Sequence, residues 1–287
     1  MRVLRPFLSL VAASAATTIG ASLVLPAAVR HRNASAAGVP SDSTSDLLMF
    51  IGSAVLALAV ATLVIHWLGV FVVGGIHLVL GGLAVLVPTG GVLSGAYSPI
   101  FEIASMLRGL DRDLGDGALI FSFSGVEFAL GAFLVAAALA VRTRQDSEPT
   151  SRPAATLASL VGAVVLGGSF ALLLTVGGDF TTSLFSFIRY DTLLAFGVAL
   201  AAVLAGIAGL TLRWASSGVL VIGALTLVAG FIAYVALDLF GVVPLWLAQT
   251  PLVAYGFSIP LGLCVVVACL VATVAPRRQV PAFDDDL

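Results

Sequence analysis

The sequence predicts an all-α integral membrane protein. It is expected to have eight transmembrane helices, built as a tandem duplication of a four-helix unit, with both termini cytoplasmic. Three observations carry this prediction: the composition, eight long apolar segments, and landmarks that recur in the second half. Of the 287 residues, 60% are hydrophobic and 10% are charged, whereas a soluble domain has about 25% charged residues. A soluble fold of this size has too little interior for the excess, so lipid is the expected solvent.

A helix that crosses a bilayer needs about 20 mainly apolar residues. Short polar breaks at residues 66–69 and 213–217 divide two stretches that are too long for one helix. The predicted spans cover residues 7–29, 47–65, 69–87, 118–141, 154–176, 192–212, 218–237 and 251–274.

The first span has an alternative interpretation as a cleaved signal peptide. Arg2 and Arg5 form a basic start, and residues 25–28 could precede a cleavage site. Cleavage would leave seven spans. The apolar stretch is long for a signal, and the internal repeat supplies it with a counterpart, so we favour a retained span.

Arginines set the predicted orientation, because cytoplasmic loops carry an excess of basic residues. All 13 basic residues are arginines. With the N-terminus inside, the cytoplasmic segments hold Arg2, Arg5, Arg142, Arg144, Arg152, Arg213, Arg277 and Arg278, and the outer loops hold Arg30, Arg32, Arg108, Arg112 and Arg189. The lack of lysine fits a GC-rich bacterium, so we expect a multi-pass protein of the plasma (inner) membrane.

An internal repeat predicts two units of the same orientation, related by an axis along the membrane normal. The first unit is expected to cover residues 1–145, a cytoplasmic linker residues 146–153, and the second unit, with a short cytoplasmic tail, residues 154–287. The matched landmarks are Asp46 with Asp191, Trp67 with Trp214, Gly69, Gly74 and Gly81 with Gly218, Gly223 and Gly230, and Phe123-Ser124 with Phe257-Ser258. Of these, Gly74, Gly81, Gly223 and Gly230 are expected to let helices pack closely, because small residues allow backbones to approach.

Glu127 is the most unusual residue of the predicted spans, since a carboxylate in lipid is costly and normally faces a partner. His77 is expected at nearly the same depth, and Ser124 lies one turn away on the same helix face. Two interpretations stay open: an ionisable pair on a polar path, or a pair that fastens two helices. By the repeat alignment, Thr226 and Leu261 take the places of His77 and Glu127 in the second unit.

The predicted outer loop, residues 88–117, contains an amphipathic pattern between residues 100 and 114, which indicates a helix along the membrane interface. At its end Asp111, Asp113 and Asp116 form a possible outer-face acidic cluster. The pattern fails the calcium-loop motif, so a solvated turn is preferred over weak cation binding. Farther along, Pro260 lies inside the eighth predicted span and predicts a kink.

No catalytic motif, metal-binding motif or phosphate-binding loop is recognisable, and the net charge of −2 gives no reason to expect a nucleic-acid partner. We therefore expect no catalytic residues, no metal and no cofactor. The sequence favours an accessory or structural subunit of a larger membrane complex, with the bilayer and protein partners, or further copies of the chain, around it. The alternatives are a small-solute or ion transporter or channel that uses the Glu127 and His77 pair, and a membrane-embedded enzyme for lipid-linked substrates.

Overall fold

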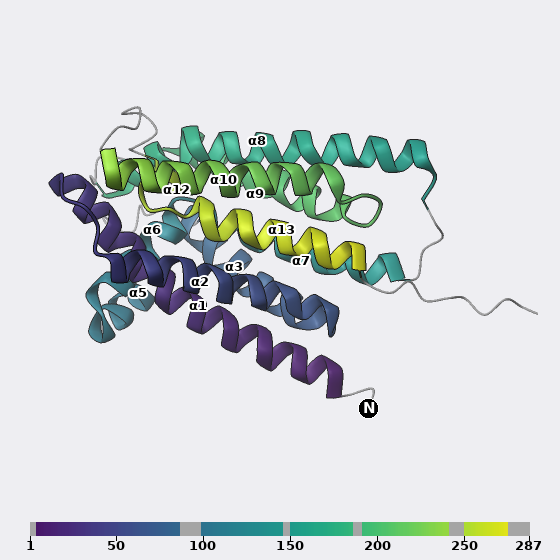
Figure 1. Ribbon diagram of the computed structural model, residues 1–287, viewed down its shortest axis with the longest axis horizontal. Helices are drawn as coiled ribbons and strands as arrows, with labels where there is room; N and C mark the ends of the chain where they lie inside the picture. Colours follow the sequence, from purple (N-terminus) through teal and green to yellow (C-terminus); the bar gives the residue numbers. More distant parts are fainter. Residues whose placement is uncertain (1–3, 87–98, 146–149, 186–190, 241–249, 275–287) are drawn as a thin grey trace, which may run out of the picture.

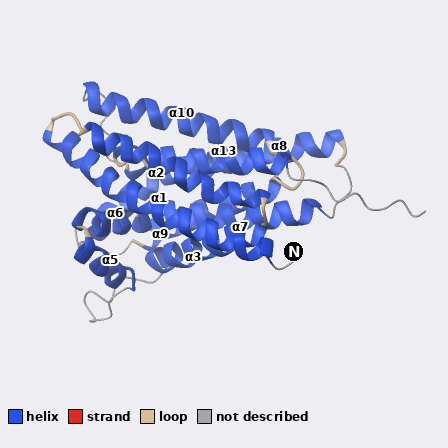
Figure 2. Ribbon diagram, turned by 60° about the horizontal axis from the view of Figure 1, so that its bottom comes forward, coloured by secondary structure: helices blue, strands red, loops and turns tan. Residues whose placement is uncertain are grey.

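The computed structural model describes residues 4–86, 99–145, 150–185, 191–240 and 250–274 of the chain. Within these ranges the chain is helical throughout, with short turns and no strand (Figure 2). The all-α prediction is therefore confirmed for the described residues.

Among the described residues, seven helices are long and apolar enough to cross a membrane, which makes this a multi-pass membrane protein. They are α1 (Leu4–Ala37), α2 (Ser43–Ala61, continued by the 3-10 turn Thr62–Val64), α3 (Trp67–Leu86), α7 (Val126–Gln145), α8 (Arg152–Phe185), α9 (Thr192–Thr211) and α10 (Ser217–Phe240). An eighth apolar helix, α13 (Ser258–Val274), has 17 residues. The other helices of the described ranges are α5 (Pro99–Leu110), α6 (Arg112–Phe123) and α12 (Pro251–Ala254).

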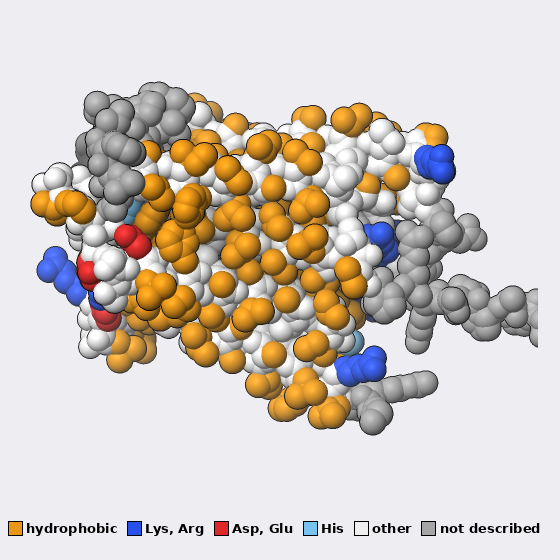
Figure 3. Space-filling view, viewed as in Figure 1, with side chains coloured by type: hydrophobic (Ala, Val, Ile, Leu, Met, Phe, Trp, Pro, Cys, Tyr) orange, Lys and Arg blue, Asp and Glu red, His pale blue; other side chains and the backbone are white. Residues whose placement is uncertain are grey.

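The long helices run side by side along one direction and form an elongated bundle (Figure 1). We call the end where α5 and α6 lie the α5–α6 end. The opposite end, where α1 begins and α13 ends, is the terminus end. Apolar side chains cover the middle of the visible surface, whereas charged side chains gather at the two ends (Figure 3). This distribution suits a bundle whose middle lies in hydrocarbon.

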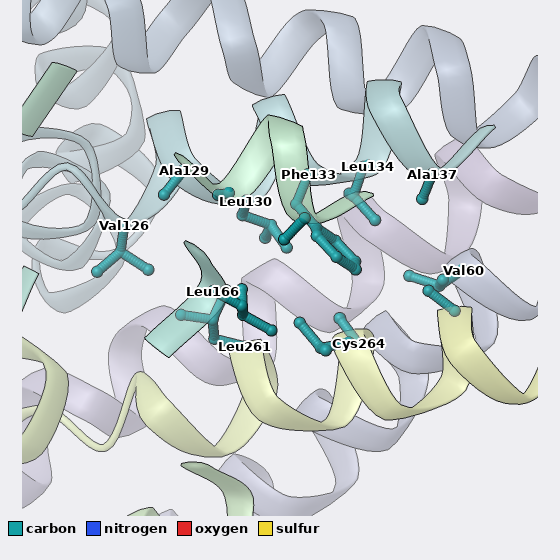
Figure 4. Packing of buried hydrophobic residues seen from close by; sticks show 14 of the residues in the cluster. Val60, Val126, Ala129, Leu130, Phe133, Leu134, Ala137, Leu166, Leu261 and Cys264 are labelled. Atoms are coloured by element: carbon teal, nitrogen blue, oxygen red, sulfur yellow. The ribbon is translucent and has the colours of Figure 1, made fainter. Parts of the chain in front are cut away.

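The two halves of the chain pack their helices in the same order. In the first half α1 packs on α2, α3 on α7, and α1 on α3; in the second, α8 packs on α9, α10 on α13, and α8 on α10. The halves join where α7 contacts α9 and where α13 contacts α2. These contacts place α7 and α13 inside the bundle. Leu130 and Phe133 of α7 point toward Leu261 and Cys264 of α13 in one large buried cluster (Figure 4).

Three details differ from the sequence predictions. The fourth predicted span is not one helix, because the chain turns at Gly125 between α6 and α7. The amphipathic segment is divided as well, since Asp111 ends the run of α5 and accepts hydrogen bonds from the first amides of α6. Pro260 does not interrupt a long helix: it lies in the first turn of α13, where a missing backbone donor costs little.

Candidate functional site

The break before α7 sets the position of the candidate site. Gly125 has a φ of +77°, a left-handed conformation that favours glycine. A Cβ at this position would also collide with Val198 of α9. Helix α7 therefore starts anew at Val126, and Glu127 lies in its first turn, where the helix dipole favours a carboxylate.

Helices α3 and α7 cross at backbone contact because glycines line both sides of the crossing. A Cβ on Gly81 would overlap the backbone of Phe128, and a Cβ on Gly131 would overlap the backbone of Leu78. Small residues permit such crossings in membranes. The crossing brings one polar side chain of α3 within reach of one of α7.

These two side chains are His77 and Glu127. The Nδ1 atom of His77 lies 2.9 Å from Oε1 of Glu127, and the side chains are 15% and 7% exposed. The hydroxyl of Ser122, in the last turn of α6, donates to Oε2 of Glu127. Each carboxylate oxygen thus has one partner, and one of those partners comes from the interrupted segment that precedes α7.

Ser124, which the sequence places beside Glu127, does not make this bond. Its hydroxyl donates to the carbonyl of Phe121 and accepts from the amide of Val126. The turn at Gly125 rotates Ser124 away from the face that Glu127 occupies and leaves Ser122 there instead. A continuous helix, which the sequence analysis assumed, would have kept Ser124 and Glu127 on one face.

A carboxyl group and an imidazole at hydrogen-bond distance can hold one proton between them. Both groups are largely removed from water, where a charged side chain is costly unless it is paired. Ionisable residues inside membranes mark proton relays and ion pathways, and they also pair to fasten helices. The surroundings of the pair distinguish these uses.

A small cavity of about 20 Å³ adjoins the pair on the side of the terminus end. His77 and Thr17 are the polar members of its lining, and Val60, Val70 and Cys264 belong to its apolar part. A cavity of this size has room for one water molecule. Water placed there would contact the imidazole from the side opposite Glu127.

A larger cavity of about 470 Å³ lies at the α5–α6 end. Arg108, Arg112, Asp116, Asn33 and Thr181 supply polar groups to its lining. This cavity is therefore accessible to water and ions, in contrast to the apolar middle of the bundle.

Aromatic rings connect the larger cavity with the pair. Tyr255 lines the cavity and stacks on Phe257, with ring centroids 5.8 Å apart. Phe257 contacts Phe121 at 5.2 Å, and Phe121 contacts the His77 ring edge-on at 6.4 Å. The rings separate the polar cavity from the carboxylate by two aromatic layers.

The crossing of α10 and α13 repeats the contacts of the first half with different side chains. Gly262 lies against the backbone of Leu227 as Gly131 lies against that of Leu78. The four glycines predicted for helix packing all face the last helix of their own half: Gly74 and Gly81 face α7, and Gly223 and Gly230 face α13.

These contacts place Thr226 at the position of His77 and Ser258 at the position of Glu127. The sequence alignment placed Leu261 there, three residues farther along. It matched Phe123-Ser124 with Phe257-Ser258, but the first pair precedes the turn at Gly125 and the second follows the turn at Gly256. The second half therefore carries a threonine and a serine where the first carries an ion-pairing couple.

A second polar cluster, which the sequence analysis missed, joins the halves at the α5–α6 end. The hydroxyl of Tyr234 in α10 donates to Oδ1 of Asp46 in α2, at 2.7 Å, and Ser41 donates to the same oxygen, at 2.6 Å. The fully buried His31 stacks on Tyr234 with ring centroids 3.6 Å apart, and its Nδ1 lies 3.9 Å from Asp46. The internal repeat singled out Asp46, but the spacing of residues in the sequence does not predict that α1 and α10 lie close together.

The predicted acidic cluster is neutralised by arginines. Asp111 and Asp113 pair with Arg30 of α1, at 3.3 and 2.8 Å. Asp116 pairs with Arg108 of α5, at 2.6 Å, and lies 3.8 Å from an arginine of its own helix. The three carboxylates therefore hold α5 and α6 to each other and to α1.

Among the described residues, no group of three His, Cys, Asp or Glu side chains is placed to hold a metal ion. The chain matches no protein-family model, no curated protein and no solved structure. The geometry of the pair and of its surroundings therefore carries the functional argument.

Proposed function

We propose that the protein is a proton-exchanging membrane transporter, in which Glu127 and His77 together bind and release a proton. One observation carries the proposal: the last helix of each half is preceded by an interruption with a left-handed glycine, Gly125 before α7 and Gly256 before α13. Interrupted helices at corresponding positions of two halves are typical of the substrate and ion sites of secondary transporters. The ionisable pair lies directly at the first interruption.

The cavities support a route to this pair. The cavity at the α5–α6 end supplies water, the ring of Phe121 separates it from His77, and the water-sized cavity continues from His77 toward the terminus end. Beyond it the buried side chains of Val60 and Val70 close the route. With aromatic rings on one side and these valines on the other, the arrangement corresponds to an occluded state, in which the site is closed toward both ends between its two open states.

The proposal includes the topology predicted from the sequence: eight spans, a tandem duplication and cytoplasmic termini. The equivalent helix contacts of the two halves support the duplication. With α13 as the eighth span, the terminus end is the cytoplasmic end. The α5–α6 end, with its polar cavity, is then the outer end.

Proton flux into vesicles tests the function directly. The purified chain would be reconstituted into vesicles that contain a pH-sensitive dye, and a potassium gradient with valinomycin would drive protons inward. We expect flux above that of protein-free vesicles, and we expect Glu127→Gln to abolish it while the folded yield stays comparable. Glu102→Gln is the matched control, because Glu102 is exposed on α5. Flux equal to that of empty vesicles, or full flux in Glu127→Gln, would show the proposal to be wrong.

The accessory-subunit role, which the sequence favours, is the second candidate, and a specific observation supports it. Both oxygens of Glu127 are paired within the chain, with His77 and Ser122, as expected for a structural clasp between α3, α6 and α7. Purification in mild detergent followed by mass spectrometry distinguishes the two roles. Stoichiometric partner proteins, together with no flux from the chain alone, would support the subunit role.

A further inference from the structure

Helices α8 and α10 leave a groove of about 390 Å³ in the second half of the bundle. Its walls are mostly apolar, with Phe170 and Leu174 from α8, Leu225 and Ala233 from α10, and Leu252 from α12. The volume lies in the range of about 300–1,000 Å³ that is typical of small-molecule sites. Leu225 is 59% exposed, so the groove opens toward the surroundings of the bundle.

A buried hydroxyl at one end of this groove has no partner among the described residues. Ser258 is 6% exposed, lines the groove, and its Oγ atom makes no hydrogen bond. The interruption at Gly256 explains this, because Ser258 is the first residue of α13 and has no preceding helical turn whose carbonyl could accept the hydroxyl. The equivalent position in the first half, Glu127, is fully paired. Buried polar groups nearly always have partners, so the unpaired hydroxyl indicates a ligand.

We propose that the groove binds one acyl chain of a membrane lipid, with the carbonyl oxygen of the chain accepting a hydrogen bond from Ser258. The depth of Ser258 favours this occupant. Helix α13 has 17 residues and spans about 26 Å at 1.5 Å per residue, close to the hydrocarbon thickness of about 30 Å. Its first residue therefore lies at the boundary of the hydrocarbon, where lipid ester carbonyls lie.

The rest of the groove follows the path that the chain would take. Gly167 and Ile222 line its deeper part, and the hydroxyl of Thr226 is already bonded to the carbonyl of Ile222. The deeper walls of the groove are thus apolar, and their one hydroxyl already has a hydrogen-bond partner.

Photo-crosslinking tests the proposal. The protein would be reconstituted in vesicles of phosphatidylethanolamine and phosphatidylglycerol containing a phosphatidylcholine with a diazirine in its acyl chain, and labelled residues would be mapped by mass spectrometry. We expect labelling of the groove walls well above that of the exposed face of α9 around Phe196 and Val203. Ala171→Phe combined with Ala229→Phe fills the groove from both walls and should remove this excess. Val228→Phe, on the exposed side of α10, is the matched control.

Ser258→Ala tests the hydrogen bond separately from folding. The variant removes an unpaired hydroxyl, so the lipid-free protein should keep its thermal stability, while crosslinking in the groove should fall about fivefold. Equal labelling of the groove and of α9, or labelling that persists in the filled double variant, would overturn the proposal. Crosslinks from the groove to a second copy of the chain would likewise overturn it and assign the groove to an oligomer.

Discussion

The two halves of the bundle share one helix crossing but place different chemistry in it. In the first half the crossing of α3 and α7 carries His77 and Glu127, which pair with each other. In the second, the crossing of α10 and α13 carries Thr226, which bonds to its own helix, and Ser258, which has no partner among the described residues.

The comparison shows that the backbone geometry and the site chemistry are separable. The glycines at the crossings maintain close contact in both halves, so the polar side chains are free to differ. The first half satisfies its polar groups internally, whereas the second leaves a hydroxyl facing a groove. The two proposals thus assign an ion site to the first half and a lipid site to the equivalent position of the second half.

The largest expected effect comes from breaking the crossing itself. Gly131→Val and Gly262→Val each push a side chain into backbone of the neighbouring helix. Overpacking typically costs about 1–3 kcal/mol, and we expect more here because the obstacle is backbone, which cannot move aside as a flexible side chain can. Folded yield, followed by fluorescence-detected size exclusion, should collapse in both variants. Gly75→Ala is the control, because nothing lies within 4 Å of a Cβ there. Normal yield in either valine variant would refute the shared crossing.

The next prediction exchanges the chemistry of the halves. Glu127→Ser alone leaves His77 buried without its partner, and breaking a buried pair costs about 3–5 kcal/mol. The double variant His77→Thr with Glu127→Ser reproduces the second half and should recover most of this loss. Thermal unfolding in detergent measures the stability, and the double variant should remain inactive in proton flux. A double variant as unstable as the single one would contradict the separation of crossing and chemistry.

A smaller effect is expected at the junction of the halves. Tyr234→Phe removes the hydrogen bond to Asp46, which should destabilise the protein by about 1.5–3 kcal/mol because the acceptor is charged. The lower melting temperature should be accompanied by faster hydrogen exchange in the first turns of α2. Tyr255→Phe, in which an equally large ring loses the same atom at the cavity edge, should change the melting temperature less.

The smallest effect concerns pH and is confined to the first half. His66 Nδ1 accepts a hydrogen bond from the amide of Leu68 at the start of α3, and burial, followed by the charge of Arg142, lowers the pKa of His66 below its usual value. Above pH of about 6.5 both the folded and unfolded forms are neutral and this stabilisation is complete. As the pH falls through that value, the unfolded chain takes up the proton first, so the stabilisation is lost.

Hydrogen exchange of the two turns measures this difference. Exchange in residues 62–68 should accelerate on acidification, whereas the corresponding turn of the second half, residues 212–218, contains no histidine and should not respond. His66→Asn keeps a side-chain acceptor without titrating and should remove the response. Equal acceleration in both turns would show that another group is responsible.

The sequence predicted the parts of the fold that depend on composition and on the spacing of residues along a helix. The spans around α2, α3, α9 and α10 follow from long apolar runs, and the helix-packing glycines follow from their spacing. The turn at Gly125 was not predicted, because residues 118–141 form one long and largely apolar run, and only the left-handed backbone and the contact with Val198 reveal the break. That turn is also the reason that the hydroxyl of Ser122, rather than that of Ser124, donates to Glu127.

The cluster of His31, Asp46 and Tyr234 illustrates the other limit. Its members lie on α1, α2 and α10 and meet through the packing of the two halves, which no local pattern encodes. The groove of the second half depends in the same way on the distance between α8 and α10. Pairings within one helix turn can be predicted from spacing, whereas meetings of distant helices require the three-dimensional arrangement.

The length of α1 has a consequence for the surroundings of the cavity at the α5–α6 end. Its 34 residues extend about 51 Å, against about 30 Å of hydrocarbon. Asn33, which lines the cavity at the α5–α6 end, follows the predicted span at residues 7–29 and therefore lies in the headgroup layer. A leaflet rich in anionic lipid has a surface potential of about −30 mV, which concentrates protons by about half a pH unit at the surface. The lipid composition of the host membrane would therefore set the acidity at the entrance to the cavity.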